Sequence, residues 1–341
     1  MPDRAQGKVN LFSGLAALLL FLLFPAVLMH AQEAAPSPQN GSHTTGTDDT
    51  IRVETDLVDL NVTVFSRDHQ RTVGQLEQKD FKVFEDGAAQ EISFFATAEA
   101  PFDLVLLLDL SGSTIDKLKL IKKSATGFIE SARDTDRIAI VTFTDKLEVV
   151  SPLTSDREYL KERVKKIAKP KGGTNFWDAL HYVLKTMLNP ERTARRSAVV
   201  LMTDGVDNAL PDVAGPGSET TFDELLELVT RSSPIVIPIY LDTERDMLEV
   251  RRIFTKDAYH IARQHLALIA VESGSNLYYA RKVEDLKNVY KQVISDLGTV
   301  YSIGYLPINR ARDGSWRMVK VQLNARPELA ARTRRGYFAG K

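Results

Sequence analysis

The sequence predicts an α/β protein: a doubly wound, Rossmann-like domain with a mainly parallel sheet, flanked by segments that form a small β-sandwich. Short, continuous apolar runs such as FDLVLLLD and SAVVLMTDG are typical of strands buried on both faces of a parallel sheet. Helical patterns separate these runs, and strands that alternate with helices indicate right-handed crossovers. The strand-like residue patterns toward both ends of the 341-residue chain predict the sandwich.

The first 50 residues have the features of an export signal followed by a tether. Residues 1–31 combine a basic start, an apolar stretch from Leu11 to Met29 and a small-residue exit, which is the layout of a secretory signal peptide. The apolar stretch is also long enough to span a bilayer, so an uncleaved N-terminal membrane anchor is an alternative to the cleaved signal peptide. Residues 32–50 are small and polar, which predicts a flexible linker. We therefore expect a protein that is secreted or held in the periplasm or cell envelope, with no membrane span after cleavage.

The segments 51–99 and 300–341 have the composition of antiparallel β-structure. The first alternates apolar and polar residues and places Asp86-Gly87 between two β-rich runs, which is a hairpin signal. The second contains the aromatic and β-branched runs VYSIGYLP and SWRMVKVQL. Neither segment is large enough to bury a core alone. We expect them to pack together, with the α/β domain of residues 100–299 emerging between them.

The elements of residues 100–299 follow from the apolar pattern. Buried strands are expected at FDLVLLLD, RIAIVTFTD, SAVVLMTDG and PIVIPIYLD. Helices are expected at about 115–132, 156–167, 177–188, 222–232, 256–272 and 283–297. Open α/β sheets bind ligands outside the carboxyl ends of their strands, so we expect a site at that edge.

Composition excludes several classes of function. Lysine and arginine total 44 and aspartate and glutamate 45, a balance that argues against a nucleic-acid partner. The absence of cysteine excludes disulfides, thiolate zinc sites and thiol nucleophiles. The chain also lacks a Gly-x-Ser-x-Gly elbow and a His-Glu-x-x-His helix. We therefore expect a protein that is not an enzyme.

Polar side chains that suit a hard metal ion follow the expected strands. Asp109, Ser111 and Ser113 come at the end of the first strand, Thr174 lies in KPKGGTNF just before a helix, and Asp204 ends the run LMTD. Carboxylate and hydroxyl oxygens are the ligands that Mg²⁺ prefers, and Mn²⁺ is its usual substitute. Serine and threonine are also preferred helix N-caps, so DLSGST taken alone is explained as well by capping.

The segment DLSGST fits Asp-x-Ser-x-Ser, and together with the downstream GGT and TDG it resembles von Willebrand factor type A (VWA) domains over about residues 102–299. The flanks are similar to those of secreted bacterial proteins with such a domain. The resemblance implies a metal-ion-dependent adhesion site with three hydroxyl ligands and two aspartates that act mostly through water. These residues are Ser111, Ser113, Thr174, Asp109 and Asp204. The implied function is that of an exported adhesion module, which captures an Asp or Glu of a protein partner through the bound cation.

Two other functions stay open: an envelope component in which the metal only fastens loops together, and a metal-assisted hydrolase. The hydrolase is less favoured because no positioned base or nucleophile is evident. Residues 209–220, rich in glycine and proline, leave the expected metal edge and either select partners or form an idle insertion. Asp207 and Asn208 are expected to shape a turn rather than to hold a water beside the metal.

Overall fold

The computed structural model describes most of the chain from residue 57 onward. The described ranges are 57–67, 74–114, 117–169, 172–189, 195–245, 247–248 and 254–340. The expected signal peptide and linker, residues 1–31 and 32–50, lie outside these ranges. Residues 54–341 form one compact unit. None of the helices in the described ranges is long and apolar enough to cross a membrane.

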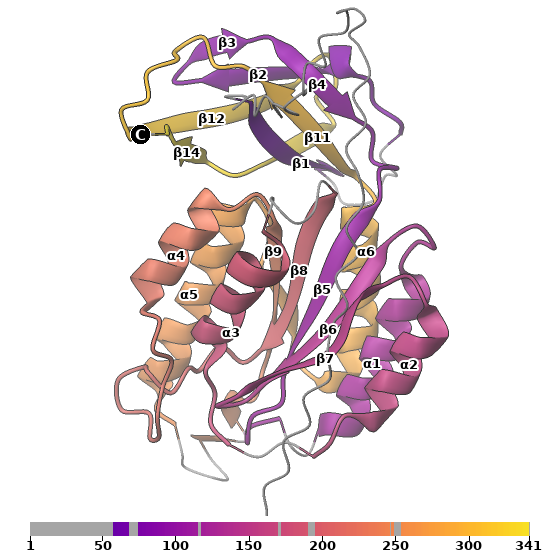
Figure 1. Ribbon diagram of the computed structural model, residues 1–341, viewed down its shortest axis with the longest axis vertical. Helices are drawn as coiled ribbons and strands as arrows, with labels where there is room; N and C mark the ends of the chain where they lie inside the picture. The colour runs from indigo at the N-terminus through magenta and orange to yellow at the C-terminus, as the bar shows by residue number, and fades with distance from the viewer. Residues whose placement is uncertain are drawn as a thin grey trace, which may run out of the picture. The chain divides into compact units, whose positions relative to one another are not determined.

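A six-stranded sheet in the order β10-β9-β8-β5-β6-β7 forms the centre of the α/β domain and confirms the predicted doubly wound α/β fold (Figure 1). The strands are β5 (Phe102–Asp109), β6 (Arg137–Phe143), β7 (Leu147–Thr154), β8 (Arg196–Thr203), β9 (Ile235–Leu241) and β10 (Tyr278–Ala280). All neighbouring pairs are parallel except β6 and β7. From β5 the chain continues through the neighbouring β6 and the edge strand β7 and then crosses back to β8 on the other side of β5, so the strand order reverses between β5 and β8. That reversal is where open sheets place ligands.

Helices cover both faces of this sheet (Figure 1). One face packs against α1 (Leu118–Ser131), α2 (Arg157–Lys166) and α6 (Leu286–Leu297), with the short η5 (Val283–Asp285) before α6. The other face packs against α3 (Phe176–Tyr182), α4 (Phe222–Arg231) and α5 (Lys256–Ser273). A π-helical turn, η3 (Val183–Met187), continues α3. Because β5 and β8 are buried on both faces, their side chains are apolar without a break from Leu104 to Leu108 and from Ala198 to Met202.

The segments before and after the α/β domain are interleaved in two four-stranded sheets, ordered β13-β1-β11-β4 and β14-β12-β2-β3. The strands are β1 (Val58–Ser66), β2 (Phe81–Glu85), β3 (Ala88–Gln90), β4 (Ile92–Ala96), β11 (Val300–Tyr305), β12 (Trp316–Leu323), β13 (Leu329–Arg332) and β14 (Gly336–Phe338), with η1 (Gln78–Asp80) before β2. β1 pairs antiparallel with β11, and β2 with β12. Asp86 and Gly87 have φ of 48° and 86° between β2 and β3, as a two-residue type I′ hairpin requires. Both sheets contribute to one apolar core, so the early and late segments bury each other.

Arg196, the first residue of β8, joins the sandwich to the central sheet. Its guanidinium donates hydrogen bonds to the carbonyls of Ala98, Ala100 and Val300 and lies 4.2 Å from the ring centroid of Phe102. Burial lowers the pKa of Arg196 to about 10. The three carbonyls lie where the chain enters and leaves the α/β domain. One side chain therefore binds both of the segments that connect this domain to the sandwich.

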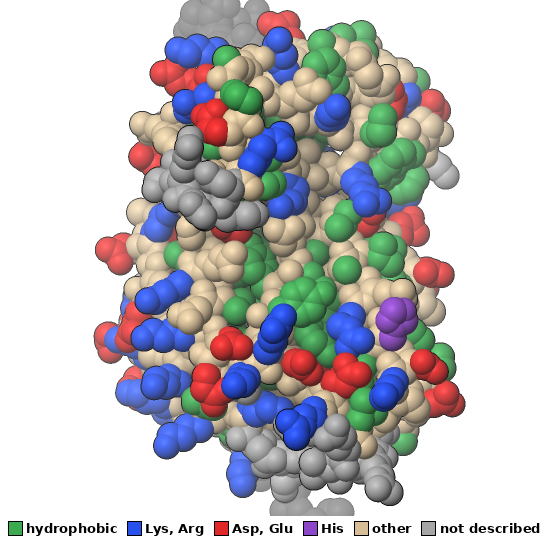
Figure 2. Space-filling view, turned by 180° about the vertical axis from the view of Figure 1, so that it is seen from behind, with side chains coloured by type: hydrophobic (Ala, Val, Ile, Leu, Met, Phe, Trp, Pro, Cys, Tyr) green, Lys and Arg blue, Asp and Glu red, His purple; other side chains and the backbone are tan. Residues whose placement is uncertain are grey.

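The surface carries both signs of charge. Seen from behind, acidic and basic side chains lie side by side over the lower half of the molecule (Figure 2). Several pair within one helix, such as Lys165 with Glu162 and Arg231 with Glu227. Exposed pairs of this kind each contribute less than about 1 kcal/mol, so the stability of the fold comes mainly from the buried core.

The ring of His265 on α5 lies flat against Phe222 on α4, with centroids 3.5 Å apart and planes 7° apart. Burial lowers the pKa of His265 to about 4, although nearby Asp223 opposes the shift. In the unfolded chain the imidazole titrates near the ordinary value of 6.5. The unfolded state therefore binds a proton first as the pH falls, and stability present above pH 6.5 is lost as the pH falls toward 4.

Replacing His265 with phenylalanine is expected to remove that part of the pH dependence while keeping the stacked contact. Urea unfolding of both proteins at pH 7.5 and pH 4.5 measures it. The free energy of unfolding should fall less for His265→Phe than for the wild type. Equal falls would show that His265 titrates normally in the folded protein.

Candidate metal centre

Asp109 ends β5, and its side chain is fully buried. Its Oδ1 accepts a hydrogen bond of 2.8 Å from the Ser111 backbone N–H, and its Oδ2 accepts one of 2.6 Å from the Thr203 hydroxyl. Thr203 is the last residue of β8, the neighbouring strand. The carboxylate is therefore held from its own loop and from the next strand, at the point where the strand order reverses.

Ser111 and Ser113 are buried in the turn that follows Asp109, with their hydroxyl oxygens 3.1 Å apart. The Thr114 hydroxyl donates to the carbonyls of Asp109 and Ser111, which stabilises this turn. Helix α1 begins later, at Leu118, and its N-cap residue makes no side-chain capping bond. The two serine hydroxyls are therefore not N-caps of α1, and their close approach needs another explanation.

Asp204 follows β8 directly and is also fully buried. Its Oδ1 accepts from the Val206 N–H at 3.2 Å, and its Oδ2 accepts from the Thr243 hydroxyl at 2.7 Å. The Thr243 oxygen lies 2.8 Å from the phenol oxygen of Tyr259 on α5. Since the Thr243 hydrogen is given to Asp204, the phenol donates to Thr243. This chain of hydrogen bonds orients the Asp204 carboxylate.

The negative charges of the two ionised carboxylates repel each other, which raises the energy of their ionised forms. Burial, and then the charge of Asp204, raise the pKa of Asp109 to about 7. Burial also raises the pKa of Asp204, against hydrogen bonds from Thr243 and Ser113. The charge of Lys117 lowers the pKa of Asp204, but by less than burial raises it. Two buried acids close to each other are costly in their ionised forms, and a divalent ion beside them would favour those forms.

Thr174 is buried in the loop before α3, beside the serine turn. A Cβ built on Gly112 would lie 3.9 Å from the Gly172 carbonyl oxygen, so the two loops approach closely. The structure therefore brings all five residues of the predicted site to one edge of β5 and β8. Of the two lysines near Thr174, Lys169 is exposed and Lys171 lies outside the described residues.

The donor set fits a hard divalent cation. It combines the carboxylates of Asp109 and Asp204 with the hydroxyls of Ser111, Ser113 and Thr174, and oxygen ligands of these kinds suit Mg²⁺ or Mn²⁺. No described group of three or more His, Cys, Asp or Glu side chains could hold a metal. A metal at this edge would depend on the hydroxyls as much as on the acids.

Three residues that support the site escaped the sequence analysis: Thr203, Thr243 and Tyr259. Thr203 and Thr243 each lie at or just beyond the carboxyl end of a central strand. A search for hydroxyl residues at every strand end would have found both. Tyr259 lies inside α5, and no local pattern marks it.

Asp207 and Asn208 shape a turn, as the sequence predicts, but they also bind other loops. Asp207 accepts hydrogen bonds from the backbone of Trp177 and Ala209 and from both the N–H and the hydroxyl of Ser218. Asn208 contacts the loop that carries Thr174. The turn therefore fastens the site to the segment of residues 209–220.

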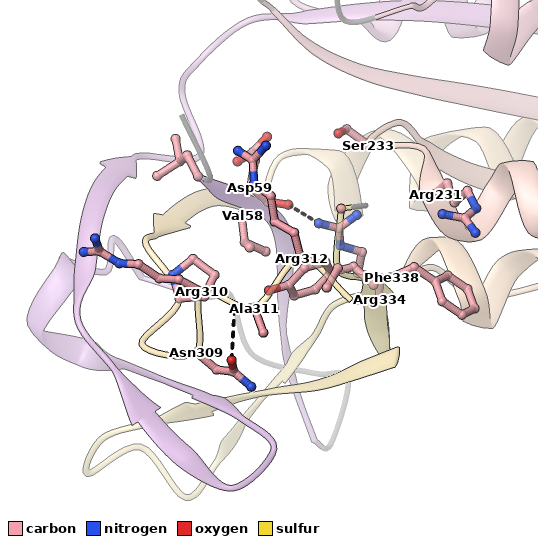
Figure 3. Close-up of a pocket in the computed structure, with 15 residues that line it drawn as sticks. Val58, Asp59, Arg231, Ser233, Asn309, Arg310, Ala311, Arg312, Arg334 and Phe338 are labelled. Carbon is pink, nitrogen blue, oxygen red and sulfur yellow. Dashed lines mark hydrogen bonds between the residues drawn. The ribbon is translucent and has the colours of Figure 1, made fainter. Parts of the chain in front are cut away.

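A separate pocket of about 360 Å³ lies where the sandwich meets the end of α4 (Figure 3). Its basic side chains are largely engaged within the protein. Arg334 donates to the Asp59 carbonyl, Arg231 pairs with Glu227, and Arg312 also has a partner. Figure 3 shows Arg310 extending away from the others. We assign the pocket a structural part in this junction.

Comparison with known proteins places residues 103–237 in the family model described as the von Willebrand factor type A domain. The human voltage-dependent calcium channel subunit alpha-2/delta-2 is 27% identical over 126 residues, which cover 34% of this chain and 11% of that subunit. An uncharacterized protein of Borreliella burgdorferi is 29% identical over 114 residues, covering 31% of this chain and 33% of that protein.

Among solved structures, proximal thread matrix protein 1 from the mussel byssus matches with a TM-score of 0.46 and 15% identity, covering 61% of this chain and 48% of that one. The chain thus spans about a tenth of the length of the calcium channel subunits, 11%, and a third of the Borreliella protein, 33%. The similarity to these two relatives is confined to part of this chain.

Proposed function

This chain contains a von Willebrand factor type A domain, and from that premise we propose that it is an exported, metal-dependent binding module. The module captures an acidic group of a protein partner through a divalent cation, Mg²⁺ in the first place. Ser111, Ser113 and Thr174 would ligate the cation, and Asp109 and Asp204 would act on it mostly through water and orient the serines. The apolar N-terminal stretch supports export to the cell envelope or beyond.

One observation carries the proposal: two fully buried carboxylates lie at the strand-order reversal, and burial raises the pKa of both, which the charge of Lys117 on Asp204 does not offset. Buried acids are normally paired with a cation or coordinate a metal. The adjacent serine hydroxyls, 3.1 Å apart, add neutral oxygen donors at the same place. A metal ion accounts for both features, whereas helix capping accounts for neither.

The same donor set favours binding over catalysis. When bound, the cation would supply an electron-poor centre for an incoming acid, because only two of the five residues around it carry charge and its hydroxyl ligands are neutral. No histidine lies among these ligands, and the other acids and hydroxyls near them are held in hydrogen bonds, as Thr203 and Thr243 are. A hydrolase would need a free base beside an activated water. We therefore propose a non-enzymatic site.

Direct titration with Mn²⁺ tests the proposal. We expect one ion per chain, displaced by Mg²⁺ and removed by EDTA, measured by electron paramagnetic resonance of the free ion. N-acetylaspartate amide, added as a carboxylate probe, should bind to the Mn²⁺-loaded protein and not to the EDTA-treated protein. Failure to bind Mn²⁺ would refute the metal site. Probe binding that ignores EDTA would refute metal-dependent capture.

A further inference from the structure

Asn208 contacts both backbone polar groups of Thr174. Its own N–H donates to the Thr174 carbonyl at 2.8 Å, and its side-chain Oδ1 accepts from the Thr174 N–H at 3.1 Å. Its Nδ2 donates to the carbonyl of Ala214 at 3.1 Å. A flipped amide would set an NH₂ group against an N–H and an oxygen against a carbonyl, so only this orientation satisfies the contacts.

Two glycines let the Asn208 side chain insert between these loops. A Cβ on Gly173 would lie 2.2 Å from Asn208 Nδ2, and a Cβ on Gly215 would lie 2.6 Å from the same atom. Gly215 also has a φ of 107°, which disfavours other residues. The Asn208 side chain is thus enclosed by backbone on both sides and has little freedom to move.

The chain around Thr174 is fixed on its other side as well. The next residue, Asn175, donates its backbone N–H to the carbonyl of Thr144 at 2.9 Å and its side-chain amide to Gly217 at 3.2 Å. All these contacts are made within the protein itself. These hydrogen bonds therefore form whether or not a partner protein is bound.

We propose that Asn208 is a positioning residue that holds Thr174 at the metal edge before any partner arrives. The inference rests on the proposed metal site and deepens it: Thr174 contributes to the affinity for the metal itself and is not recruited by the captured acid. Asn208 also connects Thr174 to residues 209–217 through its hydrogen bonds. This loop therefore supports the site and is not an idle insertion.

A double-mutant cycle on Mn²⁺ binding tests the inference with Asn208→Ala, Thr174→Ala and the double variant. We expect Asn208→Ala to weaken Mn²⁺ binding by about 10-fold, the usual scale for residues that orient ligands. Water-proton relaxation should show one more exchangeable water on the bound Mn²⁺. If Asn208 acts through Thr174, the double variant binds no more weakly than Thr174→Ala alone.

Ser218→Ala is the matched control. It removes the hydroxyl bond to Asp207 and the acceptor for the Asp178 N–H in the same network without touching Thr174, so it should keep the wild-type affinity and water count. Asn208→Asp, which retains the acceptor for the Thr174 N–H, should recover part of the loss despite its missing donor to Ala214.

Two outcomes would overturn the inference while leaving the metal site intact: wild-type affinity in Asn208→Ala, or losses that add in the double variant. An equal loss in Ser218→Ala would also overturn it, because the effect would then be one of general loop stability. A wild-type protein that binds no Mn²⁺ would instead refute the proposed function, and this inference with it.

Discussion

Asp204→Asn is expected to weaken Mn²⁺ binding by about 100-fold or more, because charge count governs affinity at such sites. The metal-free variant should unfold at the same temperature as the wild type or higher. Asparagine keeps the shape of the side chain and an acceptor oxygen for the Val206 N–H, and it loses the acceptor for the Thr243 hydroxyl. It also removes one of two buried like charges, so the pKa of Asp109 should fall.

Mn²⁺ titration and thermal unfolding in EDTA measure these two effects separately. Asp242→Asn is the matched control, because Asp242 is an exposed aspartate just beyond β9 at the same edge, and its carboxylate accepts from the Glu244 N–H. It should keep full affinity. Retained affinity in Asp204→Asn would exclude Asp204 from the site. A large loss of metal-free stability would indicate that its carboxylate is mainly structural.

Arg196→Met is expected to destabilise the folded protein by about 3–5 kcal/mol, since charged hydrogen bonds to three backbone carbonyls are lost together. Methionine fills part of the space but donates no hydrogen bond. The carbonyls of Ala98, Ala100 and Val300 then lose this partner at the entry and exit of the α/β domain. The stacking of the guanidinium on Phe102 is lost as well.

Guanidinium chloride unfolding at neutral pH measures this loss as a change in the free energy of unfolding. Arg335→Met is the comparison, because Arg335 is an exposed arginine whose pair with Glu272 spans 3.6 Å. It should cost less than about 1 kcal/mol. If both variants lose equally little, the sandwich and the central sheet are held together by their other contacts, and Arg196 is dispensable.

The order of elements along the chain was predictable because it follows from local patterns. Buried parallel strands have continuous apolar runs, and helices alternate with them, which was enough for the doubly wound fold. The edge strand β7 was missed because it is antiparallel and half-exposed, so it lacks such a run. The predicted helix from 177 to 188 changes to π-helical geometry after Tyr182, and no pattern of residues in the sequence predicts this change.

The sequence by itself determined which residue types stand at the strand ends, and hence that hydroxyls and acids gather at one edge of the sheet. Only the tertiary structure decided how they are held. Thr203 contacts Asp109 across 94 residues, Thr243 contacts Asp204 across 39, and Asn208 contacts Thr174 across 34. Such contacts depend on the order of neighbouring strands and on the path of the loops. Local sequence specifies neither, because the chain must close long loops before these side chains can meet.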